Sequence, residues 1–291
     1  MKLPISYGRQ YISDGDIQAV VETLKSDYLT CGPKIPEFEQ AFCEYVHAKY
    51  SVAVCNATAA LHIAAMALGV KEGDNVICTP MTFASSANCI RFCGGNVKFV
   101  DIDPETYLLD INKLKEILST APKGTYKGMV LVDFAGYPHN MEEYRKVADE
   151  YGMWILEDAC HAPGAYFIDS TGERVYCGCG KYSDITVFSF HPVKHITTGE
   201  GGMACTQNKE YYEKMALYRT HGITHEAEKL QREDGLWYYE MQELGYNYRI
   251  TDIQAALGTS QLKRARKNVE IRRELVRKYN EAFVRDRKSV V

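Results

Sequence analysis

The sequence predicts an α/β fold in which a mainly parallel sheet lies between layers of helices. Three observations support this prediction. From residue 51 onwards short strands alternate with helical segments, and the strands are apolar along their whole length. The chain has 291 residues, of which 46% are hydrophobic and 25% charged, which is typical of a globular protein with a large core. Continuously apolar strands separated by helices indicate a parallel sheet that is covered on both faces.

The predicted elements follow in order along the chain. Apolar residues at helical spacing predict a helix at residues 14–24, with Asp16 near its N-cap, and a second helix at residues 35–46 after a Gly-Pro turn. Strands are predicted at residues 51–55, 75–78, 97–100, 129–132, 154–156 and 185–188. Further helices are predicted at residues 58–68, 84–92, 111–118, 141–151, 252–262 and 267–283.

Composition and charge exclude several classes of protein. The 34 Lys and Arg residues against 38 Asp and Glu residues give a net charge of −4, so we expect no nucleic-acid partner. No run approaches 18 apolar residues, and the chain starts Met-Lys-Leu-Pro without an apolar signal segment. We therefore expect a cytoplasmic protein without a membrane partner, whose ten cysteines are reduced. Cys177 and Cys179 lack the second spaced pair of a structural zinc site, so we expect no metal.

Lys194 lies in the most informative segment, residues 189–202. A strand ends at Ser189, and Lys194 follows on a proline-containing connection beside a glycine-rich turn. Ligands of open α/β sheets bind at the carboxyl ends of the strands, where a lysine can form a Schiff base. A loop lysine considered alone is more often a solvated surface charge, so this segment leaves both interpretations open.

Asp158 follows another buried strand. A buried carboxylate is costly unless a cation pairs with it, and the protonated pyridine nitrogen of pyridoxal phosphate would be such a cation. The alternative is an N-cap for the next helix. His161, three residues later, would contact the cofactor or be structural.

Two further segments suit a phosphorylated planar cofactor. Residues 56–60 join a strand to a helix N-terminus, whose free N–H groups and dipole favour a phosphate, although any such junction offers N–H groups. Thr58 adds a hydroxyl group. Phe83, just past a strand and a proline, would cover the face of a ring or belong to the core.

The order and spacing of these motifs resemble the DegT/StrS-type sugar-nucleotide aminotransferases, which have the pyridoxal-phosphate fold type I. The match is collinear from residue 6 to about residue 279. It is carried by residues 28–33, 73–74, 79–83, 99–103, 157–159, Lys194, 199–202 and 243–258. Residues 8–10, 56–62, 85–89, 158–161 and 190–195 are most similar to the branch that acts in pseudaminic acid biosynthesis.

The resemblance implies a role for each site residue. Lys194 would bind pyridoxal 5'-phosphate covalently and carry the transferred proton, while Asp158 would keep the pyridine nitrogen protonated. His161 would lie near the phenolic oxygen and Phe83 on the ring. The implied phosphate ligands are Ala57, Thr58 and Ser189, with Asn247 of the neighbouring subunit of a homodimer that shares its active sites. The implied nucleotide-sugar contacts are Tyr7, Asp27, Tyr28, Leu29 and Thr30.

The implied reaction moves the amino group of L-glutamate, which becomes 2-oxoglutarate, to C4 of a UDP-linked 4-keto-6-deoxy-N-acetylaminosugar. The implied domains are an N-terminal arm and helix at 1–30, a large cofactor-binding domain at 31–260, and at 261–291 the start of a C-terminal small domain that is largely missing. We therefore expect a dimer that binds the cofactor but turns over nucleotide-sugar poorly.

Three other functions stay open at this point. The first is amination of another nucleotide-linked 4-keto or 3-keto sugar. The second is sugar dehydration or deoxygenation, but in that branch of the family a histidine replaces the lysine that is present here as Lys194. The third is a non-catalytic remnant that binds the cofactor.

Overall fold

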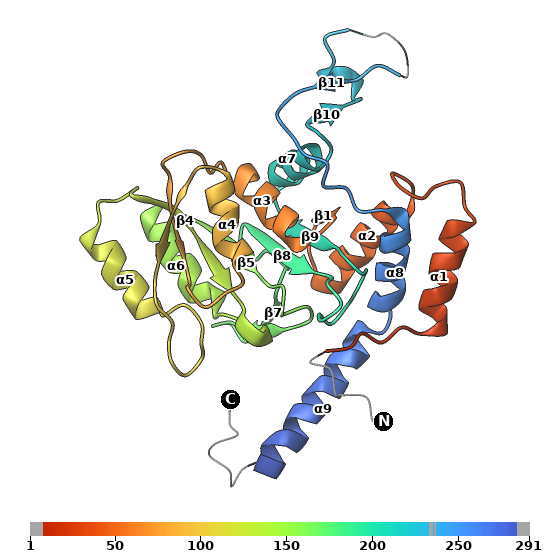
Figure 1. The fold of residues 1–291 in the computed structure, drawn as a ribbon. Helices are drawn as coiled ribbons and strands as arrows, with labels where there is room; N and C mark the ends of the chain where they lie inside the picture. Colours follow the sequence, from red (N-terminus) through yellow and green to blue (C-terminus); the bar gives the residue numbers. More distant parts are fainter. Residues whose placement is uncertain (1–7, 233–234, 236, 284–291) are drawn as a thin grey trace.

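The computed structural model describes residues 8–232, 235 and 237–283. One large sheet forms the centre of the described part, with helices on both of its faces (Figure 1). Its strands lie in the order β1-β9-β8-β5-β4-β2-β3. In chain order they are β1 (Tyr50–Val54), β2 (Asn75–Cys78), β3 (Asn96–Phe99), β4 (Tyr126–Val132), β5 (Trp154–Asp158), β8 (Ile185–Ser189) and β9 (Gly202–Thr206).

The pairings in this sheet are parallel, apart from the two that β9 makes with β1 and β8. The carboxyl ends of β1, β8, β5, β4 and β2 therefore meet at one edge of the sheet, where open α/β folds bind their ligands. The predicted α/β fold with a mainly parallel sheet is confirmed.

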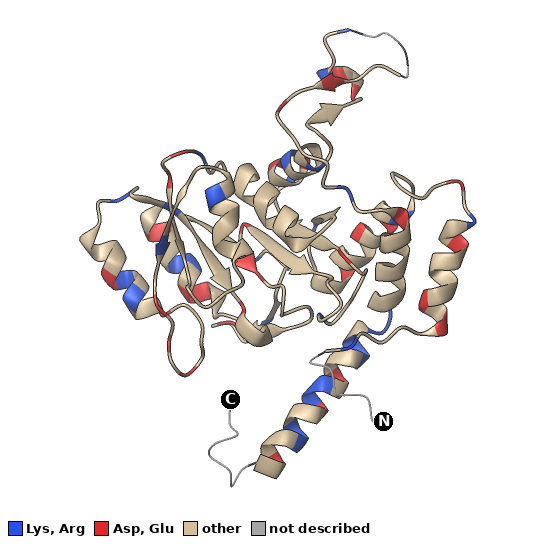
Figure 2. Cartoon of the chain, viewed as in Figure 1, with Lys and Arg blue, Asp and Glu red and all other residues tan. Residues whose placement is uncertain are grey.

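Helices cover the two faces of the sheet with different partners. One face packs against α3 (Ala57–Ala67), α4 (Ser85–Phe92) and α7 (Lys209–Arg219). The other packs against α2 (Lys34–Val46), α5 (Ile111–Thr120), α6 (Met141–Tyr151) and α8 (Asp252–Leu262). Helix α3 carries no charged residue, as Figure 2 shows, because it is buried almost all round.

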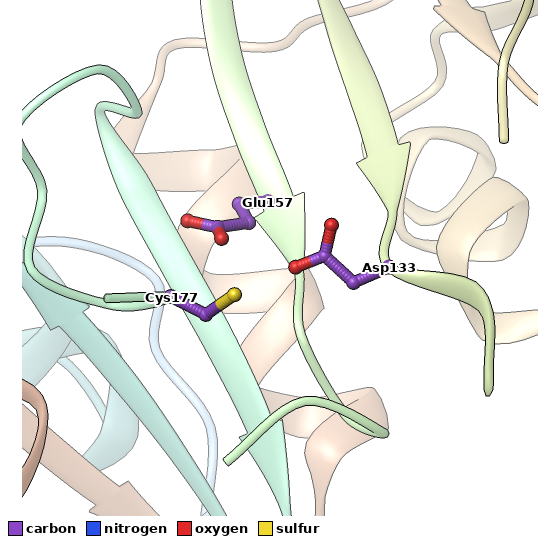
Figure 3. Close-up of side chains that lie close together, drawn as sticks. All are labelled: Asp133, Glu157 and Cys177. Carbon is purple, nitrogen blue, oxygen red and sulfur yellow. The ribbon is translucent and has the colours of Figure 1, made fainter. Parts of the chain in front are cut away.

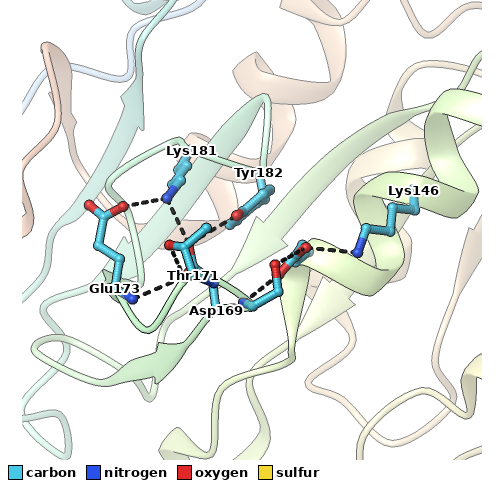
Figure 4. A network of polar contacts seen from close by, with 8 residues as sticks. Lys146, Asp169, Thr171, Glu173, Lys181 and Tyr182 are labelled. Carbon is cyan, nitrogen blue, oxygen red and sulfur yellow. Dashed lines mark hydrogen bonds and ion pairs between the residues drawn. The ribbon is translucent and has the colours of Figure 1, made fainter.

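The remaining elements lie at the periphery. They are the helices α1 (Asp14–Leu24) and α9 (Ala265–Phe283), the strand pairs β6 (Tyr166–Ile168) with β7 (Arg174–Tyr176) and β10 (Ile223–Thr224) with β11 (Glu240–Met241), and the 3-10 turns η1 (Phe134–Gly136) and η2 (Ala227–Lys229). The β6–β7 turn is held by Asp169, which accepts hydrogen bonds from Thr171, Lys181 and Tyr182 (Figure 4). No helix in the described ranges combines the length and apolar character needed to cross a membrane.

Most predicted helices and strands are present, with ends that shift by a few residues, but the sequence did not indicate β9 or α7. The run Gly202–Thr206 contains few β-branched residues, and it is a strand because β1 and β8 bond it from both sides. The residues of α7 show no clear apolar stripe along one helical face.

Helix α1 buries a polar residue, whereas two apolar residues of its helical spacing are half exposed. Ser13 is its N-cap, and Asp16 is the third helical residue in a reciprocal capping box with Ser13. Asp16 is fully buried against α8, where Ser260 and Gln261 donate to it and Arg264 pairs with it. Burial alone would raise the pKa of Asp16, but the hydrogen bonds and charge of Arg264 lower it to about 2. The apolar residues Ile17 and Leu24 are instead about half exposed.

Candidate active site

The predicted cofactor residues come from the ends of several strands, and the topology brings these ends to one edge of the sheet. Asp158 and Ser189 are the last residues of β5 and β8. Ala57 begins α3 directly after β1, and Phe83 follows β2. Lys194 lies five residues beyond the end of β8, in a loop that returns to β9.

The N-terminus of α3 forms a cradle for an anion. Asn56 caps the helix by accepting a hydrogen bond from the N–H of Ala59 at 2.8 Å, while helix geometry leaves the N–H groups of Ala57 and Thr58 without acceptors inside the helix. Gly202 stands opposite Ser189 in the β8–β9 register. A Cβ atom at Gly202 would lie 2.6 Å from the Ala57 nitrogen, so glycine is what allows β9 to approach this helix end. The Ser189 hydroxyl and the α3 N-terminus thus flank a residue without a side chain, which suits a phosphate.

Asp158 is buried and bonded only to uncharged groups. The Ser86 hydroxyl donates to its Oδ2 at 2.6 Å, and the Cys160 N–H donates to its Oδ1 at 3.2 Å. No Lys, Arg or His of the described ranges forms an ion pair with it. A buried carboxylate without a cation is costly, so this arrangement suits a cationic ligand group.

The Lys194 loop is closed by backbone hydrogen bonds. The Phe190 N–H donates to Gly201 and the Thr198 N–H donates to Phe190, at 2.9 and 3.0 Å. This closure places Lys194 near the end of β5, where its positive charge influences both Cys160 and His161. The lysine side chain is half-buried at this edge of the sheet.

His161 is fixed in orientation by the loop after β4. Its Nδ1 accepts a hydrogen bond from the Ala135 N–H at 3.3 Å. Burial and the charge of Lys194 lower the pKa of His161, partly opposed by Asp158, so the ring is neutral at neutral pH. Because Nδ1 accepts, the single ring proton lies on Nε2, which makes Nε2–H the donor that His161 offers to a ligand.

Phe83 is a large aromatic side chain that stays 75% exposed. The residue before it, Thr82, shares a 2.6 Å hydrogen bond with Ser86, and Ser86 in turn donates to Asp158. The hydrogen bonds of Thr82 and Ser86 therefore fix the backbone next to Phe83 relative to the Asp158 carboxylate. Its exposed ring suits a planar ligand in front of Asp158.

Several other predicted residues lie outside this group. Asp27, Tyr28, Leu29 and Thr30 are exposed in the loop between α1 and α2. Asn247 is also exposed, and its backbone pairs with Thr220. No hydrogen bond between described residues joins this set to Lys194 or Asp158. Tyr7 lies outside the described residues.

Sequence reasoning missed three contributions to the site. Ser86 and Cys160 donate to Asp158, and the Ala135 N–H orients His161. Ser86 could have been suspected, because Thr82 and Ser86 are four residues apart at the start of a helix. The Cys160 and Ala135 contacts are made by backbone N–H groups, so the residue type at these positions does not predict them.

A second group of buried acids lies on the other side of β5. The ligand atoms of Asp133, Glu157 and Cys177 lie within 4.8 Å of one another (Figure 3). Ser183 and Thr186 donate to Glu157 at 2.9 and 2.6 Å. Burial raises the pKa of both carboxyls, and the charge of Asp133 raises that of Glu157 further, so the pair retains a proton at neutral pH. That proton reduces the negative charge of the cluster without a cation.

Comparison with known proteins identifies the family. The model of the DegT/DnrJ/EryC1/StrS aminotransferase family matches residues 10–290. The chain belongs to this family. The aminotransferase is 40% identical over 280 residues to the UDP-4-amino-4,6-dideoxy-N-acetyl-beta-L-altrosamine transaminase of Campylobacter jejuni, covering 96% of this chain and 69% of that protein.

Two solved structures resemble the aminotransferase closely. Helicobacter pylori PseC, an aminotransferase of pseudoaminic acid biosynthesis, has a TM-score of 0.87 and 30% identity, over 98% of this chain and 72% of PseC. Spr1654 of Streptococcus pneumoniae in its PLP-form has a TM-score of 0.83 and 28% identity, over 98% of this chain and 73% of that protein. The predicted family is confirmed, and the chain is a sugar aminotransferase that uses pyridoxal 5'-phosphate.

The residues of the aminotransferase fit this cofactor. The cradle beside Gly202 suits a phosphate, and the unpaired Asp158 suits a protonated ring nitrogen. When bound, pyridoxal 5'-phosphate supplies an electron sink and a carrier for the amino group. The protein supplies a carboxylate that two donors orient, a neutral histidine with a defined donor atom, and a lysine that can carry a proton at Nζ.

Proposed function

We propose that this aminotransferase moves the amino group of L-glutamate to C4 of a UDP-linked 4-keto-6-deoxy-N-acetylaminosugar. The observation that supports this substrate is the 40% identity over 280 residues to the altrosamine transaminase of C. jejuni. The site is consistent with such a reaction, because a buried carboxylate without a cation, a lysine and an anion cradle lie at one edge of the sheet.

Each cofactor residue has a proposed task. Lys194 would hold the cofactor covalently, and its Nζ would carry the proton that leaves the α-carbon of the amino donor. Asp158 keeps the ring nitrogen protonated, in a position set by the Ser86 hydroxyl and the Cys160 N–H. His161 donates from Nε2 to the phenolic oxygen, since Ala135 occupies its Nδ1.

The remaining cofactor residues fix the ring and the phosphate. Phe83 stacks on the ring face, which accounts for its exposure before the ligand binds. Ala57 and Thr58 bind the phosphate through their N–H groups, and Ser189 binds it through its hydroxyl on the other side of Gly202.

Sugar recognition and assembly complete the proposal. Asp27, Tyr28, Leu29, Thr30 and Tyr7 contact the nucleotide-sugar, and Asn247 reaches the phosphate of the neighbouring subunit in a homodimer. Tyr28 and Leu29 are exposed apolar side chains, as are Ile17 and Leu24 on the adjacent α1. Such a patch suits an interface.

The reaction is tested with glutamate and a panel of UDP-linked 4-keto and 3-keto sugars, by identifying the position and configuration of the new amine. Amination at C4 of an N-acetylated 6-deoxy sugar is the expected product. Amination at C3, or of a different sugar only, would replace the proposed substrate, and absence of any amination would leave a protein that only binds the cofactor.

Assembly is tested by sedimentation together with cofactor absorbance. We expect a dimer that retains the cofactor and an Asn247→Ala variant that retains it less tightly, because the two chains complete one site. A monomer that holds the cofactor as tightly as the dimer would contradict the shared site.

A further inference from the structure

A cavity of about 260 Å³ lies beside the candidate cofactor site. Its walls come from the loops after three neighbouring strands, with Gly136 after β4, His161 after β5 and His195 after β8. The fourth wall is α9, the blue helix at the bottom of Figure 1, through Arg272 and Arg273. The cavity therefore shares His161 with the cofactor site, and His195 is next to Lys194 in the chain.

The cavity is basic. None of its described lining residues is acidic, whereas α9 contributes two arginines to it; Figure 2 shows basic residues along this helix. No Asp or Glu of the described residues forms an ion pair with Arg272 or Arg273. Arg273 instead lies over the ring of Tyr166, with 5.6 Å between the guanidinium carbon and the ring centroid. Guanidinium groups without a carboxylate partner suit a planar anion such as a carboxylate.

His195 adds a buried polar atom that has no partner. Its Nδ1 is inaccessible to solvent and makes no hydrogen bond within the described structure. Burial and the positive charges of Arg272 and Lys194 lower the pKa of His195 to about 4, so the ring is neutral at neutral pH. His195 therefore adds no negative charge and no competing cation to the wall of the cavity.

The size and position of the cavity select the ligand. A volume of about 260 Å³ lies near the lower end of the range of roughly 300–1,000 Å³ that is usual for drug-sized ligands, which suits a small ligand. An amino acid is small, always carries a carboxylate, and must bring its amino group to the cofactor beside Lys194.

We propose that this cavity binds a carboxylate of the amino donor, held by Arg272 and Arg273. The proposal rests on the proposed aminotransferase reaction and adds a donor subsite to it. Arg272 is the residue to test, because it lines the cavity, whereas Arg273 also lies over the ring of Tyr166.

The test uses glutarate, a five-carbon dicarboxylate that has no amino group and cannot react. Its dissociation constant is measured by calorimetry on the cofactor-loaded protein and on its Arg272→Gln and Arg277→Gln variants. Arg277 lies on the same helix, pairs with Glu274 and Glu281 and does not line the cavity, so it is a matched control. We expect binding to weaken about tenfold or more in Arg272→Gln, as for the loss of a charge-assisted hydrogen bond, and to change less than about twofold in Arg277→Gln.

A parallel titration with UDP distinguishes a carboxylate site from a nucleotide phosphate site. We expect Arg272→Gln to leave UDP binding unchanged. The proposal is overturned if glutarate does not bind the wild-type protein, if Arg272→Gln binds glutarate as tightly as wild type, or if UDP and glutarate weaken equally.

The two half-reactions separate this proposal from the proposed function. Arg272→Gln should require a higher glutamate concentration for the donor step, followed by cofactor absorbance, while amination of the keto sugar by the aminated protein stays unchanged. If the wild-type protein binds glutarate through Arg272 but aminates no UDP-linked sugar, the donor subsite stands and the acceptor assignment fails. If the donor step does not respond to Arg272→Gln although glutarate binding does, the cavity is an anion site but not the donor subsite.

Discussion

Glu157 and Asp158 are consecutive residues of β5, and both are buried, but they point to opposite faces of the sheet. Asp158 faces α4, where Ser86 donates to it and no cation of the described residues pairs with it. Glu157 faces the other side, where Ser183 and Thr186 donate to it and Asp133 lies close by (Figure 3).

The two acids differ in how their negative charge is compensated. Burial raises the pKa of Glu157 and Asp133, so that pair keeps a proton and the chain itself compensates most of its charge. Asp158 has hydrogen bonds but no ion-pair partner among the described residues, which suits a cation bound in front of it. We infer that the α4 side of β5 serves the cofactor and the opposite side serves the fold.

The largest expected effect is the loss of transamination when Lys194, at the edge of the sheet, is replaced. Lys194→Ala should lower transamination by at least about a thousandfold, because covalent attachment and proton transfer are both lost, and should remove the visible absorbance of the lysine-bound cofactor. The exposed Lys115 of α5 provides the control, and Lys115→Ala should leave both unchanged. A transamination rate of Lys194→Ala close to that of wild type would mean that the reaction does not take place at this edge of the sheet.

The next effect concerns the phosphate cradle. Gly202→Ala should weaken cofactor binding by about tenfold or more, because the new Cβ atom would lie 2.6 Å from the Ala57 nitrogen. Gly15→Ala adds a Cβ atom without a close contact and is the matched control. The comparison is measured by fluorescence titration of the cofactor-free protein, and equal affinities would mean that the phosphate binds elsewhere.

A pH series tests the other side of β5. The folded-state pKa of Glu157 is raised, so the folded protein holds a proton that the unfolded chain releases above pH of about 4.3. Its stabilisation is therefore complete below that pH and is lost as pH rises through the folded-state pKa, at about 1.4 kcal/mol for each unit between the two values. Glu157→Gln should flatten the decline in the free energy of unfolding between pH 5 and 9, measured with urea. An unaltered slope would mean that Glu157 is already ionised.

The smallest effects come from removing one hydroxyl on each side. Ser86→Ala should lower the rate of transamination about threefold to tenfold, since it loosens Asp158, and should cost about 1 kcal/mol in the free energy of unfolding, since it removes a buried hydrogen bond. Ser183→Ala should cost about 1 kcal/mol in the free energy of unfolding and leave the rate unchanged, since it bonds Glu157. A lower rate in Ser183→Ala together with an unchanged rate in Ser86→Ala would mean that Glu157, and not Asp158, serves the cofactor.

Much of the fold could be predicted, because short, continuously apolar strands alternate with helical segments along the chain. The predicted cofactor residues follow the strand ends, and parallel topology gathers strand ends at one edge whatever the detailed packing. Lys194, Asp158 and the Ala57–Thr58 junction needed only this rule to be placed near one another.

The rest depends on long-range contacts that residue patterns do not encode. Strand β9 is held by its two neighbours, and α1 buries Asp16 against Arg264 of a segment almost 250 positions later. Ser86 reaches Asp158 only after α4 has packed on the sheet, and the Ala135 N–H that orients His161 comes from a backbone that could belong to any residue.

The account is tested most directly by the rate of the glutamate step in two amide variants, each of which removes one carboxylate from β5 at nearly constant shape. Asp158→Asn should bind the cofactor and slow the step by about a hundredfold or more, because a preorganised charge is lost. The rate of Glu157→Gln should stay within a few-fold of the wild-type rate, because Glu157 lies on the face of the sheet opposite to Asp158 and does not contact the cofactor. Equal slowing in both variants, or an Asp158→Asn rate near wild type, would contradict the division of the two acids between cofactor and fold.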